Sequence, residues 1–211
     1  MLPPKSRRTV LRLLEKEYGN TTTALTFKSD FQLLVATIMS AQSTDVQVNK
    51  ITTPLFKEYP DAKAIASLSL EELEDKIKKV GLFRSKAKNI LATANIIVND
   101  YNGDIPRTRD ELVKLPGVGR KTANVVISVA FGTPAIAVDT HVFRVSNRIG
   151  LANAGNELKT EKQLMENIPE SQWAQAHHWL IWHGRKVCKS QNPLCEICML
   201  QKECEYFQDK K

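Results

Sequence analysis

Four cysteines are gathered in one short segment of the 211-residue sequence, which contains no others. Their spacing is C-x6-C-x2-C-x5-C, and they are Cys188, Cys195, Cys198 and Cys204. A disulfide framework usually spreads its cysteines along a small secreted chain, so this grouping indicates a local metal site instead. Four thiolates can hold a tetrahedral zinc ion or a [4Fe–4S] cluster, and the spacing alone leaves both open.

A glycine-containing hairpin, Leu115-Pro-Gly-Val-Gly-Arg-Lys-Thr-Ala123, precedes a predicted helix. Gly117 and Gly119 permit backbone geometry that a side chain would block, and the helix N-terminus beside them favours an anion. We expect Val118 to pack inward while both glycines and Arg120 face a DNA phosphate. A plain helix–turn–helix corner is the alternative, but the full run is typical of a helix-hairpin-helix motif, which binds backbone and reads no bases.

Lys121 and Asp139 are the candidate catalytic residues. Lys121 is predicted in the first turn of the helix after the hairpin, where its charge opposes the helix dipole. It could contact a phosphate, or, if partly buried and uncharged, its amine could attack carbon. Asp139 is predicted at the start of another helix, where it could act simply as an N-cap. A capped carboxylate has a fixed direction, so it could also stabilise positive charge on a sugar carbon.

The elements that must position these residues are predicted to be helices along almost the whole chain, which indicates an all-α fold. Capping boxes are expected at Ser69 with Glu72 and at Thr108 with Glu111, and Asp30 is expected to cap a helix. Gly81 should stop a helix, and Pro54 should break or kink the segment beginning near Thr44. Further helices are predicted over 140–149, 160–168 and 171–186, after a connector at 132–137.

Composition and charge narrow the function classes. Hydrophobic residues make up 42% and charged residues 25% of the chain, with a net charge of +7. No apolar run reaches the roughly 18 residues of a membrane helix, and the N-terminal residues do not resemble a secretory signal. We therefore expect a cytoplasmic monomer without a membrane partner. One stretch of the sequence is basic and comprises Lys78, Lys79, Arg84, Lys86 and Lys88. Such a stretch favours a polyanion as the binding partner.

The segments LPGVGRKTANVV and VDTHVFRV, together with MSAQSTDVQVNK, VGLFRSKAKNI and the cysteine spacing, resemble the endonuclease III family of base-excision repair glycosylases. The resemblance covers nearly the whole chain. It implies two helical lobes with a cleft between them. One would be a central six-helix, barrel-like domain over 24–134 that contains the helix-hairpin-helix. The other, an iron–sulfur domain, would combine 1–23 with 135–211.

The resemblance also implies a chemistry. In this family the lysine and aspartate at these positions are catalytic, so Lys121 would be the nucleophile and Asp139 the essential carboxylate. The activity implied is that of a bifunctional DNA glycosylase and AP lyase. It would excise oxidised pyrimidines from duplex DNA through a Schiff base and cleave the strand 3′ to the abasic site by β-elimination. Duplex DNA with damaged bases or abasic sites would be the partner, and the four cysteines would hold a [4Fe–4S] cluster.

The same resemblance implies which residues enter the DNA duplex when the damaged nucleotide leaves the base stack. Gln42 matches the residue that enters the duplex, and Leu82, inside the basic stretch, matches a second wedge. Without the resemblance, they would be a polar residue at a helix end and an apolar residue at a helix C-cap. Asp45 matches a position near the substrate pocket but could equally cap a helix, and His141 could line the pocket or pack at a helix start. Three basic residues lie beside the cysteines in the sequence: Arg185, Lys186 and Lys189. They could contact phosphates or form a solvated surface.

Three other functions fit parts of the pattern. An adenine-removing mismatch glycosylase of the same superfamily would lack the lysine at position 121 and usually carries an added C-terminal domain. A non-enzymatic helix-hairpin-helix DNA-binding protein would not need Lys121 and Asp139 together. A zinc-stabilised interaction protein would be distinguished by metal analysis.

Overall fold

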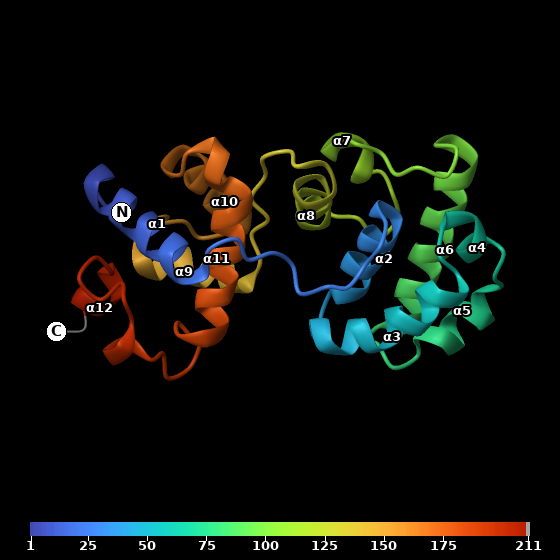
Figure 1. Cartoon of the computed structure of the whole chain (residues 1–211), viewed down its shortest axis with the longest axis horizontal. Helices are drawn as coiled ribbons and strands as arrows, with labels where there is room; N and C mark the ends of the chain where they lie inside the picture. The colour runs from blue at the N-terminus through green and yellow to red at the C-terminus, as the bar shows by residue number, and fades with distance from the viewer. Residues whose placement is uncertain (210–211) are drawn as a thin grey trace. The chain divides into compact units, whose positions relative to one another are not determined.

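A computed structural model describes residues 1–209, and every regular element in that range is a helix. Figure 1 shows helices α1 to α12. The predicted all-α class is therefore confirmed. The backbone divides into two compact units, which we call the inserted unit, Ala24–Phe131, and the terminal unit, Met1–Thr23 with the chain from Gly132 onward. No helix in the described range is long and apolar enough to cross a membrane.

The inserted unit is built around α2, in which all residues from Phe31 to Met39 are buried. Helix α2 contacts α3, α6 and α8, and α6 also contacts α4 and α5. Gln32, a buried polar residue of α2, has hydrogen-bond partners in the interior: its side chain accepts from the Lys28 N–H and donates to the Pro60 carbonyl. The helices of this unit are α2 Asp30–Ser40, α3 Asp45–Glu58, α4 Ala62–Ala66, α5 Leu70–Ile77, α6 Phe83–Asp100, α7 Arg109–Leu112 and α8 Arg120–Phe131.

Helix caps explain where several of these elements begin. The predicted capping box of α5 is confirmed, because the side chains of Ser69 and Glu72 each bond the other's backbone N–H. At α7 only half of the predicted box forms: Thr108 accepts from Glu111 N–H, but its hydroxyl donates to the Glu111 carboxylate at 2.7 Å. Asp30 does not cap α2, because Ser29 precedes it in extended backbone and accepts from the Gln32 N–H.

Pro54 does not break its helix, and the helix stop expected at Gly81 is wrong. Helix α3 continues through Pro54 to Glu58. The segment is held by burial of Ile51, Leu55 and neighbouring residues, and tertiary packing can outweigh the lost backbone hydrogen bond. Helix α5 ends at Ile77, before Gly81, and Gly81 lies instead in the turn that leads to α6.

The terminal unit packs around the fully buried Trp179, whose indole N–H donates to the Gly19 carbonyl. Helix α11 contacts both α1 and α9. Helix α1 was not among the predicted helices, although Val10, Leu11 and Leu14 follow a helical spacing and are buried. The helical elements are α1 Pro4–Tyr18, α9 Thr140–Ile149, α10 Glu157–Asn167, η1 Glu170–Gln172, α11 Trp173–Lys186, η2 Cys195–Ile197 and α12 Glu205–Gln208.

Candidate functional site

The hairpin between α7 and α8 lies in the inserted unit and is anchored on α6. Gly117 has φ +77°, and a Cβ there would lie 3.0 Å from Asn89 Cβ, so both its conformation and its neighbour require glycine. The Thr93 hydroxyl donates to the Pro116 carbonyl at 2.9 Å. Val118 is buried, as expected. These contacts hold the turn against α6.

Gly119 differs from Gly117 because nothing inside the protein requires a glycine there. A Cβ at Gly119 would meet no atom within 4 Å, and its φ is not in the left-handed region. Its position faces open space directly before α8, where the first helical N–H groups have no intrahelical partner. The fold therefore leaves room at Gly119 for an external group such as a phosphate to approach the backbone.

Lys121 lies in the first turn of α8, as predicted, beside Arg120. Both side chains are exposed, so the condition of partial burial considered for Lys121 is not met. An exposed amine at this point can reach a ligand held by the hairpin. Asp139 lies in the terminal unit, so the two candidate catalytic residues come from different units.

The turns that carry Gln42 and Leu82 lie side by side in the inserted unit. A Cβ on Gly81 would lie 3.5 Å from the Gln42 carbonyl oxygen, and Gln47 Nε2 donates to the Lys79 carbonyl. Both Gln42 and Leu82 are exposed, and Leu82 retains 59% of its accessible surface. Leu82 is the N-cap of α6, not the C-cap residue considered above. Two side chains of the matching types therefore project from adjacent turns.

Two lysines of the basic stretch, and Asp45, do not occupy the positions expected from the sequence. Lys86 is buried, and burial lowers the pKa of its ammonium, so it is no DNA-facing residue. The Lys78 ammonium pairs with Asp75 at 2.8 Å. Asp45 does not cap α3, because the Thr44 hydroxyl accepts from the Gln47 N–H.

Asp139 caps α9 in the terminal unit. Its Oδ1 accepts from the Val142 N–H at 2.7 Å, which fixes the direction of the carboxylate. His141 follows in the first turn, and its Nδ1 lies 3.1 Å from Arg144 Nη2. Desolvation lowers the pKa of His141, while the nearby Asp139 carboxylate opposes that effect.

Close packing of α11 on α9 accounts for one glycine in this region. A Cβ on Gly184 would lie 2.9 Å from His141 Nδ1 and 3.0 Å from Val145 Cγ2. His141 thus has a packing role at the helix start, one of the two roles considered for it. Trp179 belongs to the core, and Trp173 and Trp182 are partly buried against the same cluster.

The four cysteine side chains line one cavity of the terminal unit. The other lining residues are mostly apolar, and include Ile149, Val187, Leu200 and Phe207. Within residues 1–209, no three His, Cys, Asp or Glu side chains are close enough to hold a single metal ion. Four soft sulfur donors facing a shared apolar cavity form a donor set that an iron–sulfur group can use.

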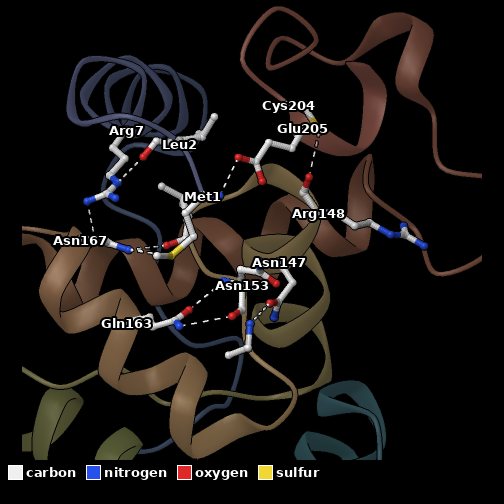
Figure 2. A network of polar contacts seen from close by, with 12 residues as sticks. Met1, Leu2, Arg7, Asn147, Arg148, Asn153, Gln163, Asn167, Cys204 and Glu205 are labelled. Atoms are coloured by element: carbon white, nitrogen blue, oxygen red, sulfur yellow. Dashed lines mark hydrogen bonds and ion pairs between the residues drawn. The ribbon is translucent and has the colours of Figure 1, made fainter. Parts of the chain in front are cut away.

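Backbone and arginine groups surround these sulfurs. The Leu200 N–H donates to Cys198 Sγ at 3.4 Å, and Arg148 Nη1 lies 3.7 Å from Cys188 Sγ. Figure 2 shows Cys204 facing the carbonyl oxygen of Arg148, at 3.5 Å. Burial raises the pKa of the Cys198 thiol to about 11, with neighbouring Cys204 adding to the rise. A positive group bound among the sulfurs would offset this penalty.

Two arginines of α9, which sequence analysis missed, hold the cysteine segment. Arg148 donates to the carbonyls of Lys189 and Ser190 and lies over the Tyr206 ring. Arg144 Nε donates to the Cys188 carbonyl at 3.1 Å. The pattern R-x3-R on a helix gives no indication of these partners, since they lie about forty residues away.

The basic residues beside the cysteines are exposed. Arg185 lies over the Trp182 ring, and Lys186 lies over both Trp182 and Tyr18. Lys189 is exposed, and its carbonyl is held by Arg148. These cations are therefore at the surface, and Arg185 and Lys186 lie over aromatic rings.

Comparison with known proteins gives a consistent assignment. Residues 35–170 match the family model of HhH-GPD superfamily base excision DNA repair proteins. Endonuclease III of Bacillus subtilis is 52% identical over 89% of this chain and 87% of its own, and that of Rickettsia felis is 48% identical over 94% and 93%. A trapped endonuclease III–DNA covalent intermediate superposes with a TM-score of 0.95 at 46% identity, covering 100% of this chain and 99% of that one. The chain therefore belongs to the endonuclease III family, within the HhH-GPD superfamily of base excision DNA repair proteins.

Proposed function

We propose that this protein is a bifunctional DNA glycosylase and AP lyase of base-excision repair, acting on oxidised pyrimidines in duplex DNA. The observation that carries the proposal is an exposed lysine, Lys121, directly after a hairpin that leaves its backbone open to a phosphate. It is supported by the full-length similarity to an endonuclease III trapped covalently on DNA.

In the proposed reaction the free amine of Lys121 attacks C1′ of the damaged nucleotide. The C1′–base bond breaks, and the base leaves with the bonding electrons and takes up a proton. The sugar ring opens to give a Schiff base between Lys121 and C1′. Loss of a proton from C2′ then expels the 3′ phosphate by β-elimination, which cuts the strand. Hydrolysis of the Schiff base returns the lysine.

Asp139 supplies the second catalytic group. Its carboxylate is held by the Val142 N–H, so it can keep a fixed direction without reorganising during the reaction. Negative charge placed near C1′ would stabilise the oxocarbenium-like transition state. The same carboxylate could accept and return protons during ring opening and elimination.

DNA contacts are assigned to residues of both units, which are exposed except for the buried Val118 and the partly exposed His141 and Asp45. Gly117, Val118, Gly119 and Arg120 form the hairpin that holds the backbone. Gln42 and Leu82 fill the space left by the extruded nucleotide. Arg185 and Lys189 contact phosphates, and His141 and Asp45 are placed near the substrate pocket.

We further propose that Cys188, Cys195, Cys198 and Cys204 hold a [4Fe–4S] cluster. Their sulfurs line one apolar cavity, and the Leu200 N–H and Arg148 guanidinium lie close enough to interact with them. When bound, the cluster would act as a structural cross-link. It would pin the segment after α11, which has few apolar residues to bury, to α9.

The domain and cellular assignments follow from this function. We infer that the helix-hairpin-helix domain comprises 24–134, where the structure has the seven helices α2 to α8 rather than six, and that 1–23 and 135–211 form an iron–sulfur domain. We expect a monomer acting on DNA in the cytoplasm, associated with the nucleoid, as its relatives are bacterial.

Borohydride trapping tests the nucleophile. Wild-type protein mixed with duplex DNA that contains an oxidised pyrimidine should give a covalent complex once the Schiff base is reduced. Lys121→Ala should give none, and undiminished trapping by that variant would exclude Lys121 as the nucleophile. Base release without trapping by the wild type would indicate a monofunctional glycosylase.

Asp139→Asn tests the carboxylate separately from the helix cap. Asparagine caps helices about as well as aspartate, so stability and DNA affinity should be retained. Turnover should fall by about 100-fold or more, as expected when a preorganised charge is removed. An active Asp139→Asn protein would show that the residue only caps α9.

A further inference from the structure

Lys86 is a buried lysine that joins the two turns carrying Gln42 and Leu82. It lies in the first turns of α6, and only 5% of the residue is exposed. A lysine is seldom buried unless specific partners hold its charge.

The ammonium of Lys86 uses all three of its donors at the end of α2. It donates to the Met39 carbonyl at 2.8 Å, the Ala41 carbonyl at 2.6 Å and the Ser43 hydroxyl at 3.1 Å. The two carbonyls lie at the C-terminal end of α2, where acceptors are unsatisfied within the helix and the dipole favours a cation. Because these acceptors flank Gln42 on both sides, the lysine fixes the turn that carries it.

The backbone of that turn is in a conformation that side chains rarely adopt. Gln42 has φ +54°, and Leu82 has φ +58°. Such left-handed residues persist when surrounding structure holds them, and they are frequent at functional sites. Here the Lys86 side chain holds Ala41 and Ser43, and the Lys86 N–H donates to the Leu82 carbonyl. One residue therefore contacts the immediate surroundings of both left-handed positions.

The two turns are also in direct proximity. A Cβ on Gly81 would lie 3.8 Å from Ser43 Oγ, which itself accepts from Lys86. An apolar residue in place of Lys86 would leave the buried Met39 carbonyl without this donor and would also release the partly buried Ala41 carbonyl, so the turn would have to move to satisfy them.

We infer that Lys86 is a positioning residue for nucleotide extrusion: its side chain holds the 41–43 turn against the start of α6, which follows Leu82 directly, so that Gln42 and Leu82 enter the duplex together. This inference rests on the proposed function. Lys86 itself touches no DNA; it acts through the two side chains that it orients. If these two side chains were misplaced, they would fill the space left by the extruded nucleotide more slowly.

Lys86→Met tests the inference, because methionine keeps much of the length and removes the three donors. We expect trapping on a duplex abasic site to slow by about 10- to 100-fold, as for a small misplacement of a positioning group. Lys63→Met is the matched control: it makes the same charge change at an exposed site on α4, and should trap at the wild-type rate.

A fluorescence measurement separates positioning from general destabilisation. 2-Aminopurine placed opposite the abasic site brightens when a protein side chain unstacks it. At saturating protein, wild type and Lys63→Met should give the full increase, and Lys86→Met should give a reduced one. An unchanged increase in a slowed variant would show that Lys86 acts elsewhere, and would overturn the inference.

A double-mutant cycle with Gln42→Ala is the decisive measurement. If Lys86 acts through the Gln42 turn, adding Lys86→Met to Gln42→Ala should slow trapping far less than it slows the wild type. Independent, multiplicative effects would overturn the inference while leaving the proposed function intact. Failure of the wild type to trap DNA would instead overturn the proposed function, and this inference with it.

Ser43→Ala provides a milder substitution if Lys86→Met unfolds at the assay temperature. It removes one of the three acceptors and leaves the lysine paired with both carbonyls. The same sub-multiplicative coupling with Gln42→Ala is expected, with a smaller loss of rate and of fluorescence. Full additivity in this pair would count against the positioning role.

Discussion

Gly117 and Gly119, two residues apart, are glycines for different reasons. Gly117 combines a left-handed backbone with a close neighbour on α6, so the protein itself requires glycine there. Gly119 has neither constraint, and its open surroundings are best explained by a ligand that approaches the backbone. A pair of alanine substitutions separates the two explanations.

Gly117→Ala should destabilise the protein by about 2 kcal/mol or more, through backbone strain and contact with Asn89. Gly119→Ala should change the free energy of unfolding by less than about 1 kcal/mol. It should nevertheless weaken binding to duplex DNA, because a methyl group would occupy the space a phosphate needs. Denaturant unfolding and DNA titration of both variants provide the check. Full affinity in a stable Gly119→Ala protein would contradict a phosphate contact at this turn.

His178 is a residue whose burial should make stability depend on pH. Desolvation lowers its pKa to about 3, and His177 adjacent to it acts in the same direction. The folded state therefore binds a proton on His178 less readily than the unfolded state does. The stabilisation is present above the unfolded pKa of 6.5 and is lost as pH falls from there toward 3.

Denaturant unfolding of the wild type should show a loss from this residue of about 2 kcal/mol between pH 7 and pH 5. His178→Gln cannot take up this proton, so its stability should fall less over the same interval. Parallel pH profiles for the two proteins would show that His178 is not responsible.

At the scale of elements, α9 connects two parts of the candidate site. Its N-cap is Asp139, and its last turn carries Arg148, which holds the segment at Cys188–Ser190 through its guanidinium. The helix therefore joins the proposed catalytic carboxylate to the cysteine segment through rigid backbone. The close contact of α11 at Gly184 fixes the first turn of α9.

Arg148→Met should loosen the cysteine segment, because two backbone carbonyls and the Tyr206 ring lose their cation. We expect a loss of about 2 kcal/mol in the free energy of unfolding and a lower iron content after purification. Arg12→Met, at an exposed position on α1, controls for the charge change and should match the wild type. Equal iron content and stability in the two variants would argue against this function of Arg148.

Metal analysis of the purified wild type decides the identity of the group. Protein prepared without oxygen should be brown and contain iron and inorganic sulfide. Stoichiometric zinc without iron or sulfide would refute the cluster and revive the alternative that the cysteine spacing left open.

At the scale of the whole molecule, electrostatics should dominate DNA affinity. The chain carries a net charge of +7, and exposed cations lie in both units, such as Arg120 and Lys189. Each phosphate neutralised on duplex DNA contributes about 0.9 to the slope of log affinity against log salt. This dependence offers a way to count contacts one at a time.

Lys189→Gln should reduce the magnitude of that slope by about 0.9, with a roughly uniform loss of affinity across DNA sequences. Lys63→Gln, which makes the same charge change at an exposed position on α4, should leave the slope unchanged. The measurement is a DNA titration at several salt concentrations. An unaltered slope for Lys189→Gln would remove this residue from the DNA interface.

Local patterns were sufficient for much of the fold. Helix α9 spans the predicted residues 140–149, because the Asp139 cap, Gly150 and the apolar spacing act over a few residues. The capping box at Ser69 and the inward packing of Val118 were predicted for the same reason. The break expected at Pro54 does not occur because burial of its neighbours, which no local pattern reports, keeps α3 continuous.

The sequence by itself determined the all-helical class, the hairpin and, through its spacing of motifs, the family. Tertiary structure alone decided which charged residues are buried and what they hold. Lys86 sits in a run of basic residues that pattern assigned to DNA, yet its partners lie 43 to 47 positions earlier in the chain. Arg144 and Arg148 likewise meet the cysteine segment some forty residues away. The composition gives the number of such charged residues, but only the packing of distant segments decides whether their side chains face water, contact DNA or are hydrogen-bonded inside the protein.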